Sequence, residues 1–378
     1  MSAESPLRVG VVGTGIFATK KHLPTYQKSN GKFKAVACFN RTKAKAEKFA
    51  KVASIEPSKV YDDLDHLLKD ETVDVVDVMV PVQFNYETAK KCIEAGKAVT
   101  LEKPIEANIE QARKLVKLAD STDIPIAIAE NWLHLECIKV VKEKLSKIGP
   151  IAAFTYNSTG AFYPSGEYMG TSWRQHPQHI GGFLSDGGVH QLALLTTLLG
   201  EVGSIAAVSR QLREQSGADD IVFSSLKLKD SDVIGTFTYG SAFGATEKSI
   251  FLKVYGLNGS VLLNVSARNG ATIKTMIGAT GEVEAKEETI QVTEQEFFGV
   301  DDEFANFHEA VVKKDKSLLK GSPRVAFHHL AVVAAFLESA ANGGSAVTVT
   351  EPWFLNDFWI NDQKTWDICK NTFFLTEV

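Results

Sequence analysis

The chain is short of cysteine and of long apolar stretches. The four cysteines among its 378 residues are Cys38, Cys92, Cys137 and Cys369. They are scattered and form no C-x-x-C pair, which predicts buried free thiols in a reducing compartment. No uninterrupted apolar run approaches the ~20 residues needed to cross a bilayer. The opening MSAESP shows no basic segment followed by an apolar core, so we expect no secretory signal and a cytoplasmic protein without a membrane partner.

An excess of charge of one sign is also missing. The chain has 41 Lys and Arg against 46 Asp and Glu, a net charge of -5 at pH 7, and a pI near 6.0. Basic residues are interspersed with acidic ones, which argues against nucleic acid or an anionic membrane as the main partner. Histidines and carboxylates show no clear metal-ligand spacing, so no metal site is expected. The length suits two domains with a large core.

What the chain does contain begins near its N-terminus. The apolar run Arg8–Val12 predicts a buried strand, and the segment 13–18 follows it with the pattern G-x-G-x-x-A. Such a pattern allows a tight turn, a close approach of the backbone to a pyrophosphate, and a helix N-terminus with free N–H groups. We predict a dinucleotide site with contacts from Gly13, Gly15, Ile16 and Phe17. A plain structural turn is the alternative.

Strand and helix signals then alternate to about residue 130. The predicted strands are Arg8–Val12, Phe33–Phe39, Val73–Val80, Ala98–Leu101 and Pro125–Ala129. Further helix signals lie between them: Asn108 begins a capping box, and Gly96 stands where a C-terminal cap is expected. Strands apolar on both faces and joined by helices predict a parallel sheet with helices on both sides.

From about residue 150 strands follow one another with few helices between them. They are predicted at Ile151–Ser158, Ser204–Leu212, Ile221–Lys229, Val233–Tyr239, Ser249–Tyr255 and Ser260–Val265, with a turn at 256–259. Helices are predicted at Gly188–Leu199, Asp302–Lys313 and Arg324–Asn342. This pattern predicts a mostly antiparallel sheet with helices on one face.

The predicted fold class is therefore α/β, with two domains and an extension. An N-terminal Rossmann dinucleotide-binding domain spans residues 1–130, and a C-terminal α+β domain with a large, mostly antiparallel open sheet spans 131–350. Residues 351–378 form an extension rich in aromatic residues, whose rings we expect to pack against the body or a second subunit. A sheet covered on one face also predicts a homodimer or a higher homo-oligomer.

The end of the second predicted strand indicates which dinucleotide is bound. NAD sites usually have an acidic residue there to bond the ribose 2′-hydroxyl. This chain instead has Asn40, Arg41 and, one helical turn later, Lys45. A guanidinium grips a phosphate through two hydrogen bonds, so the pattern favours NADP(H). A solvated basic helix start is the alternative. Pro81 closes the third strand over the cofactor, and Asn85 is predicted as the N-cap of the next helix.

Two further motifs carry chemistry. Glu102, Lys103 and a proline follow a strand at its carboxyl end, the edge where α/β sheets bind ligands. Lysine there can stabilise charge on a substrate oxygen, although an exposed lysine beside a turn proline is equally open. Asp186 and His190 stand four residues apart, in a glycine-rich turn that leads into an apolar helix. Histidine suits proton transfer near neutral pH, and a core histidine near a helix-start carboxylate is the alternative.

These motifs, together with Trp173 and Arg174, resemble the glucose–fructose oxidoreductase, inositol dehydrogenase and rhizopine-catabolism (Gfo/Idh/MocA) family from Arg8 to about Val349. The resemblance implies that Lys103, Asp186 and His190 form the catalytic group. His190 would exchange the carbinol proton, Lys103 would assist at the same oxygen, and Asp186 would position substrate and histidine. Trp173 and Arg174 would close over the nicotinamide end.

Three departures from the family pattern put the substrate in doubt. Asn85 and Ala193 stand where the family often has histidine and an acid, and Glu130–His134 stands where it often has arginine and proline. We expect an NADP-dependent oxidoreductase that moves a hydride between nicotinamide and a secondary alcohol or carbonyl of a sugar, polyol or related small molecule. A non-enzymatic NADP-binding regulatory protein on the same fold is the alternative.

Overall fold

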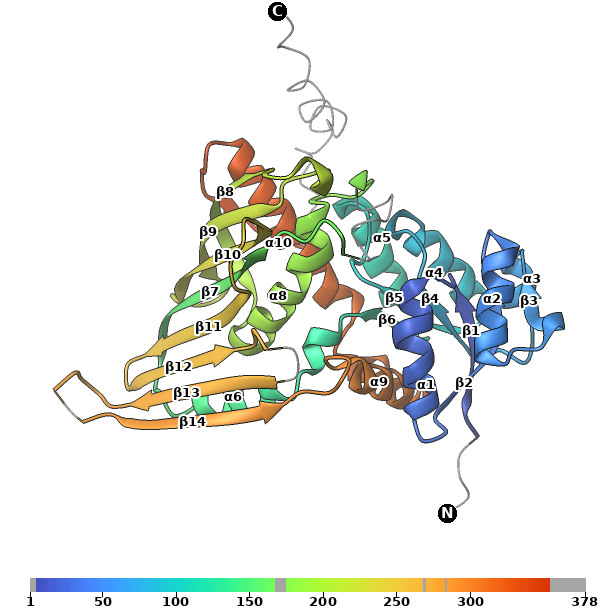
Figure 1. Cartoon of the computed structure of the whole chain (residues 1–378), viewed down its shortest axis with the longest axis horizontal. Coiled ribbons are helices and arrows are strands. Elements are labelled where there is room, and N and C mark those ends of the chain that lie inside the picture. Colours follow the sequence, from blue (N-terminus) through green and yellow to red (C-terminus); the bar gives the residue numbers. More distant parts are fainter. Residues whose placement is uncertain (1–4, 167–174, 268–269, 283, 354–378) are drawn as a thin grey trace, which may run out of the picture.

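The computed structural model describes residues 5–166, 175–267, 270–282 and 284–353, and these build two sheets (Figure 1). The first is parallel, in the order β3-β2-β1-β4-β5-β6. Its strands are β1 (Leu7–Val12), β2 (Phe33–Phe39), β3 (Val60–Tyr61), β4 (Val75–Val78), β5 (Ala98–Glu102) and β6 (Ile126–Ala129). The helices of this half are α1 (Leu23–Lys28), α2 (Lys43–Ala53), α3 (Leu64–Leu68), α4 (Asn85–Glu94) and α5 (Ile109–Asp120). The predicted parallel sheet is confirmed.

Helix boundaries in this half follow the predicted local signals. The Asn108 side chain accepts a hydrogen bond of 2.9 Å from the Gln111 N–H and so caps α5. Gly96 follows α4 with a φ of 71°, and its N–H bonds the Ile93 carbonyl. Both capping predictions are confirmed. The prediction of Asn85 as an N-cap was wrong, because Phe84 takes that position and Asn85 is the first helical residue.

The second sheet has the order β14-β13-β12-β11-β7-β10-β9-β8-β15 and is antiparallel except for the pair β7–β10. Its strands are β7 (Ile151–Ala161), β8 (Val202–Arg210), β9 (Ile221–Leu228), β10 (Ile234–Phe243), β11 (Ser249–Gly256), β12 (Gly259–Asn264), β13 (Gly270–Ile277), β14 (Lys286–Thr293) and β15 (Val347–Thr348). The helices of the second half are α6 (Cys137–Leu145), α8 (Phe183–Leu199), α9 (Val300–Lys313) and α10 (Pro323–Ala341). The mostly antiparallel sheet and the turn at 256–259 are confirmed.

Helix α8 begins earlier than the sequence predicted. The turn lies at Gly181 and Gly182, with φ of 72° and 42°, and the helix already contains Gly187. A Cβ on Gly187 would overlap the hydroxyl of Tyr239 on β10. Gly187 is therefore explained by close packing of helix on sheet rather than by a turn, which is why the predicted start at Gly188 was wrong.

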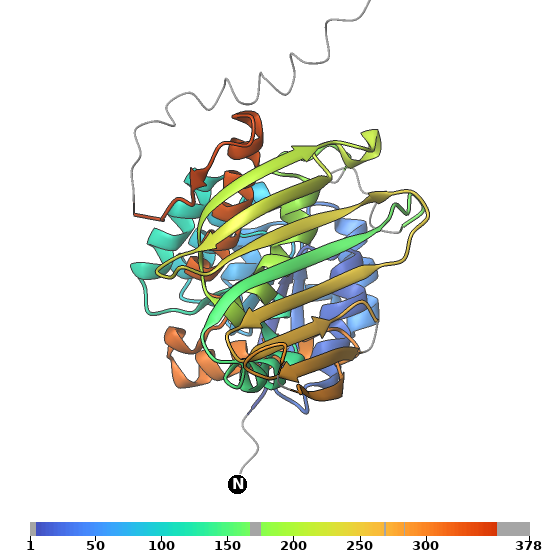
Figure 2. The ribbon, with the colours of Figure 1, turned by 90° about the vertical axis from the view of Figure 1, so that its left-hand side faces the viewer.

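One face of the second sheet is uncovered. Helices α6, α8 and α10 pack on the other face (Figure 1), and Figure 2 looks directly at the open one. Large apolar side chains alternate there with buried neighbours: Val208, Phe223, Ile234, Tyr255 and Met276 are exposed by 39 to 60 %. An open sheet face with this composition is suited to covering by another surface.

The core of the first sheet is completed by a helix from the far end of the chain. Phe304 of α9 contacts Tyr26 of α1 and Phe33 of β2 edge-on, at ring-centroid distances of 5.3 and 5.5 Å. Phe304 and Phe307 of α9 share one buried cluster with Val9 and Val11 of β1. Of the aromatic extension only its start is described, where the Arg324 guanidinium lies 4.1 Å from the centre of the Trp353 ring. The remaining aromatic residues of the extension lie outside the described residues.

Other expectations from composition can be compared with the described residues. Cys38, Cys92 and Cys137 are buried and free, and Cys369 lies outside the described part. Among the described helices, none has the length and apolar character needed to span a membrane. In the same ranges no group of three or more histidine, cysteine or acidic side chains is arranged to hold a metal ion.

We predict that Gly187→Ala destabilises the protein by about 1–3 kcal/mol through the clash with Tyr239. In a Tyr239→Phe background the nearest atom to the new methyl is a ring carbon 3.2 Å away. There the same change should cost markedly less, because the overlap with the hydroxyl is gone and alanine favours a helix over glycine by about 1 kcal/mol. Thermal unfolding of the four proteins measures this. Gly244→Ala, which meets open space, is the control, and equal destabilisation in both backgrounds would contradict the packing explanation.

Candidate active site

The glycine turn after β1 has the geometry that a dinucleotide requires. Gly13 has a φ of 93°, and a Cβ there would overlap the Met79 carbonyl. A Cβ on Gly15 would meet no atom within 4 Å, so the backbone at this position faces open space. Ile16 beside it is 36 % exposed, whereas Ala18 is buried. The turn therefore fits a pyrophosphate held close to the main chain, as the predicted NAD(P) site needs.

The end of β2 faces the same side. The Asn40 amide donates to the Thr14 hydroxyl at 3.0 Å, and its oxygen accepts from the Thr42 N–H at 2.9 Å. Asn40 thus ties the glycine turn to the start of α2. Arg41 is exposed, and its guanidinium carbon lies 5.2 Å from the centre of the exposed Phe84 ring. Lys45, also exposed, lies in the first turn of α2.

Asn85 anchors the loop that follows β5. The Asn85 amide donates to the carbonyls of Glu102, Pro104 and Ile105 at 3.1–3.2 Å. Asn85 itself is 1 % exposed, and Pro81 stands before it as the cap of the short 3₁₀ turn Val82–Phe84. The Lys103–Pro104 peptide is cis. These bonds hold the backbone on both sides of Lys103 at the carboxyl end of β5.

Lys103 reaches across to the second half of the chain. Its Nζ donates to the Asp186 carboxylate at 2.8 Å and to the Asp186 carbonyl at 2.6 Å. Both side chains are mostly buried, exposed by 14 and 17 %. Because Asp186 lies in the first turn of α8, this ion pair joins the parallel sheet to the helix that also carries His190. The structure brings Lys103 and Asp186 together as the predicted catalytic group requires.

The carboxylate bonded to His190 comes from a residue that the sequence analysis had not placed in the site. His190 Nδ1 lies 2.6 Å from Glu130 Oε1. Glu130 is 2 % exposed, follows β6 directly, and also accepts from the Trp132 N–H at 3.1 Å. The Trp132 ring stacks on the imidazole at 5.9 Å between centroids. The signal was present, because Glu130 stands at the carboxyl end of a strand, the same position that selected Lys103.

The surroundings of Glu130 favour the ionised form of its carboxyl group. Burial alone would raise the pKa of Glu130, but the hydrogen bond and charge of His190 and the charge of Lys103 outweigh it and lower the pKa. Glu130 is therefore ionised and can only accept a hydrogen bond. It follows that the proton of a neutral His190 resides on Nδ1 and that Nε2 is left to exchange a proton with another group.

A second buried group of charged side chains contacts Glu102, the last residue of β5. His22, in the π-helix Ala18–His22, lies 2.6 Å from Asp77 on β4 and 3.3 Å from Glu102. Tyr26 donates to Asp77 as well. Burial disfavours a charged His22, yet Asp77 and Glu102 raise its pKa to about 10. A buried imidazolium thus holds the carboxylate of Glu102, the last residue of β5, which Lys103 follows in the chain.

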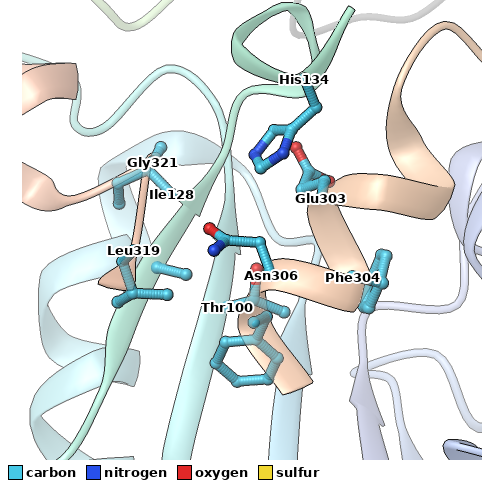
Figure 3. A pocket seen from close by; sticks show the side chains of 10 residues that line it. Thr100, Ile128, His134, Glu303, Phe304, Asn306, Leu319 and Gly321 are labelled. Atoms are coloured by element: carbon cyan, nitrogen blue, oxygen red, sulfur yellow. The ribbon is translucent and has the colours of Figure 1, made fainter. Parts of the chain in front are cut away.

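Figure 3 shows a small cavity between strands β5 and β6 and helix α9. It has a volume of about 10 Å³, enough for about one water molecule. His134 and Glu303 point toward each other at one end of it, above Asn306. Burial and the neighbouring Glu102 raise the pKa of Glu303 well above its usual value, which favours the neutral form of this acid. A cavity of this size cannot hold a sugar-sized molecule.

Trp173 and Arg174, predicted to close over the nicotinamide end, lie outside the described residues. The other predicted site residues fall into two groups. The first group belongs to the segments after β1 and β2, with Lys45 in the first turn of α2: Gly13, Gly15, Ile16, Phe17, Asn40, Arg41 and Lys45. In the second group Pro81 follows β4, Asn85 begins α4, Glu102 ends β5, Lys103 follows it, and Asp186 and His190 lie in α8. All but those in α8 lie at or after carboxyl ends of strands of one sheet.

Two family models together match most of the chain. The model described as "Oxidoreductase family, NAD-binding Rossmann fold" matches residues 7–129. The model described as "Oxidoreductase family, C-terminal alpha/beta domain" matches residues 142–349. Both are models of the Gfo/Idh/MocA group.

Individual relatives agree with these matches. An uncharacterized protein of Saccharomyces cerevisiae, YMR315W, is 58 % identical over 348 residues, which are 92 % of this chain and 100 % of that protein. Dehydrogenase FPY6 of Fusarium mangiferae is 28 % identical and covers 89 % of this chain and 97 % of its own length.

Solved structures share the fold. An oxidoreductase of Thermotoga maritima has a TM-score of 0.79 and 29 % identity and covers 91 % of this chain and 98 % of its own. A levoglucosan dehydrogenase in complex with NADH and levoglucosan has a TM-score of 0.77 at 20 % identity, with 92 and 100 % covered. With two family models that match most of it and a relative 58 % identical over 92 % of it, this chain belongs to the Gfo/Idh/MocA family of NAD(P)-binding oxidoreductases.

Proposed function

We propose that this protein is an NADP-dependent oxidoreductase that interconverts a secondary alcohol and a carbonyl on a sugar, a polyol or a related small molecule. The observation that carries the proposal is the pair of dyads Lys103–Asp186 and His190–Glu130, at 2.8 and 2.6 Å. Lys103 and Glu130 follow the carboxyl ends of β5 and β6, on the edge that also carries the glycine turn, and their partners Asp186 and His190 lie in α8. A regulatory protein that only sensed the cofactor would need neither dyad.

The nicotinamide ring, when bound, supplies the hydride acceptor or donor. The protein handles the proton and the charge. In the oxidation direction, His190 Nε2 takes the proton of the carbinol hydroxyl while Glu130 holds Nδ1–H and stabilises the imidazolium that forms. Lys103 donates a hydrogen bond to the same oxygen and stabilises charge on it, and Asp186 keeps the ammonium group in place. In reduction the proton returns from His190 to the oxygen.

The preference for NADP(H) rests on the end of β2. An acidic residue that would favour NAD is absent from Asn40, Arg41 and Thr42. Arg41 is exposed and lies over Phe84, so the ring helps to position a guanidinium whose N–H groups remain open to a phosphate. Lys45 adds a second positive charge one turn along α2. Some neighbours of this fold hold NADH, as levoglucosan dehydrogenase does, so the family fold alone leaves the choice to these side chains.

The substrate class is proposed from chemistry and from the neighbours. Levoglucosan dehydrogenase is solved with levoglucosan, and WlbA of Bordetella pertussis with UDP-GlcNAcA; both are carbohydrate derivatives. Sugars and polyols both contain the secondary carbinol that the proposed chemistry at His190 and Lys103 requires. We also propose that the protein acts in the cytoplasm, where its described free cysteines stay reduced.

Arg41→Ala tests the cofactor. Wild type should bind NADPH more tightly than NADH, and the variant should lose about 1.5–3 kcal/mol of NADPH binding with little change for NADH, because a charge-assisted contact to the 2′-phosphate is removed. Titration of cofactor fluorescence measures both. Lys34→Ala removes an exposed charge on the same strand, far from its carboxyl end, and is the control. Equal wild-type affinities for the two cofactors would refute the NADP assignment.

Glu130→Gln tests the His190 dyad. An amide can donate to Nδ1 and place the imidazole proton on Nε2, so kcat for alcohol oxidation should fall on the order of 10²–10⁴-fold while NADPH affinity stays unchanged. His190→Asn should show a similar loss. If Glu130 acts only through His190, the double variant is no worse than His190→Asn alone. Additive losses, or wild-type kcat in Glu130→Gln, would show that Glu130 does not orient the base.

We further propose that the open sheet face pairs with a second copy of the chain. Its exposed apolar residues, such as Phe223 and Ile234, need cover (Figure 2). Wild type should sediment at a multiple of 41.2 kDa at micromolar concentration. Ile234→Lys should shift the protein toward monomer, and Val52→Lys, at a 54 % exposed site on α2, should not. A wild-type monomer would count against this interface.

A further inference from the structure

We propose that Arg213 binds an anionic group of the substrate, so that the molecule turned over is a sugar acid or a sugar phosphate rather than a neutral sugar. The inference rests on the proposed oxidoreductase function and narrows its substrate class. It starts from a guanidinium that is fixed in place but only partly used.

Three contacts fix Arg213. Its N–H donates to Asp220 at 2.9 Å, its Nε donates to the Ala242 carbonyl at 2.8 Å, and its guanidinium carbon lies 5.3 Å from the centre of the Phe162 ring. The Asp220 carboxylate is buried and also accepts bonds from the Leu212 N–H and the Ser216 hydroxyl. The loop between β8 and β9 is therefore built around Asp220, and the arginine is held by main chain and ring rather than by a salt bridge.

The contacts leave the end of the guanidinium available. Arginine has five N–H donors, and only the one on Nε is bonded within the described residues. The two terminal nitrogens form a fork that matches the two oxygens of a carboxylate or phosphate. Because the side chain is already ordered, binding through this fork loses less conformational entropy than binding through a free arginine.

Strand register places the Arg213 loop at one end of the strands of the second sheet. Ala161 at the end of β7 pairs with Phe243 at the end of β10, and Ile221 at the start of β9 pairs with both Gly240 and Arg210. The strands β7, β8 and β10 therefore all end on the same side of the second sheet, and the loop with Arg213 lies at that side.

Helix α8 begins at the same edge. A Cβ on Gly182, the residue before α8, would lie 2.8 Å from the Ala218 side chain. A Cβ on Gly217 would lie 2.2 Å from the Gln175 carbonyl oxygen. One turn into α8 stands Asp186, bonded to Lys103. The Arg213 loop thus borders the start of the helix that carries Asp186 and His190. A substrate with its carbinol at His190 and Lys103 can extend an anionic group toward this loop.

The experiment compares matched neutral and charged ligands on NADPH-loaded protein. Titration calorimetry would use D-glucose against D-glucuronate and D-glucose 6-phosphate, and glycerol against glycerate and glycerol 3-phosphate. We expect at least one charged member to bind about ten times or more as tightly as its neutral counterpart, and Arg213→Ala to abolish this advantage, a loss of about 10–100-fold. The carboxylate and phosphate arms identify which anion the site prefers.

Arg210→Ala removes the same charge from an exposed position on the same edge and should leave the advantage intact. An anion-binding role predicts that Arg213→Ala weakens the binding of the charged ligands alone. A purely structural role predicts instead that loss of the Phe162 and Ala242 contacts lowers the melting temperature in thermal unfolding and weakens neutral and charged ligands equally. That result, or equal wild-type affinity within every pair, overturns the inference. Failure of the protein to bind NADPH would instead refute the proposed function and is read from the loading step itself.

Discussion

The ion pair between Lys103 and Asp186 is the contact on which the arrangement of the site depends. It joins a loop at the carboxyl end of a parallel strand to the first turn of α8. Truncating either partner would leave the other charge mostly buried and uncompensated, which is costly. Asn85 holds the lysine loop through three carbonyls, and Gly187 lets α8 lie against Tyr239. Asn85 thus positions the backbone of Lys103, and Gly187 positions the helix that carries Asp186.

Much of the fold followed from local sequence signals. The glycine pattern after β1, the caps at Asn108 and Gly96 and the turn at 256–259 are each determined by a few neighbouring residues, and all appear where expected. The candidate site was also partly predictable, because strand ends in a parallel sheet meet at one edge. That rule selected Lys103, which lies at this edge and bonds Asp186, and it would have selected Glu130 had it been applied to the fifth predicted strand.

The remainder depended on contacts between distant residues. The glycine at 187 suggested a turn because its reason, the Tyr239 hydroxyl, lies 52 positions further along the chain. Strand β14 was missed because it is largely exposed and polar, so its sequence lacks the apolar alternation that predicts a half-buried strand. Its neighbour β13 was missed as well, although burial does alternate along it. The partner of His190 is likewise 60 positions away. Neither propensity nor spacing carries such information.

Helix α9 has a consequence for how the protein is made. Phe304 and Phe307 fill the face of the first sheet that α1 also covers, yet they are synthesised some 170 residues after β6 ends. While the ribosome is still translating the middle of the chain, the nascent N-terminal half displays an apolar surface around Tyr26 and Phe33 that nothing yet covers. Its final consolidation must therefore be post-translational or nearly so, and until then this surface is a natural target for chaperones that recognise exposed aromatic side chains.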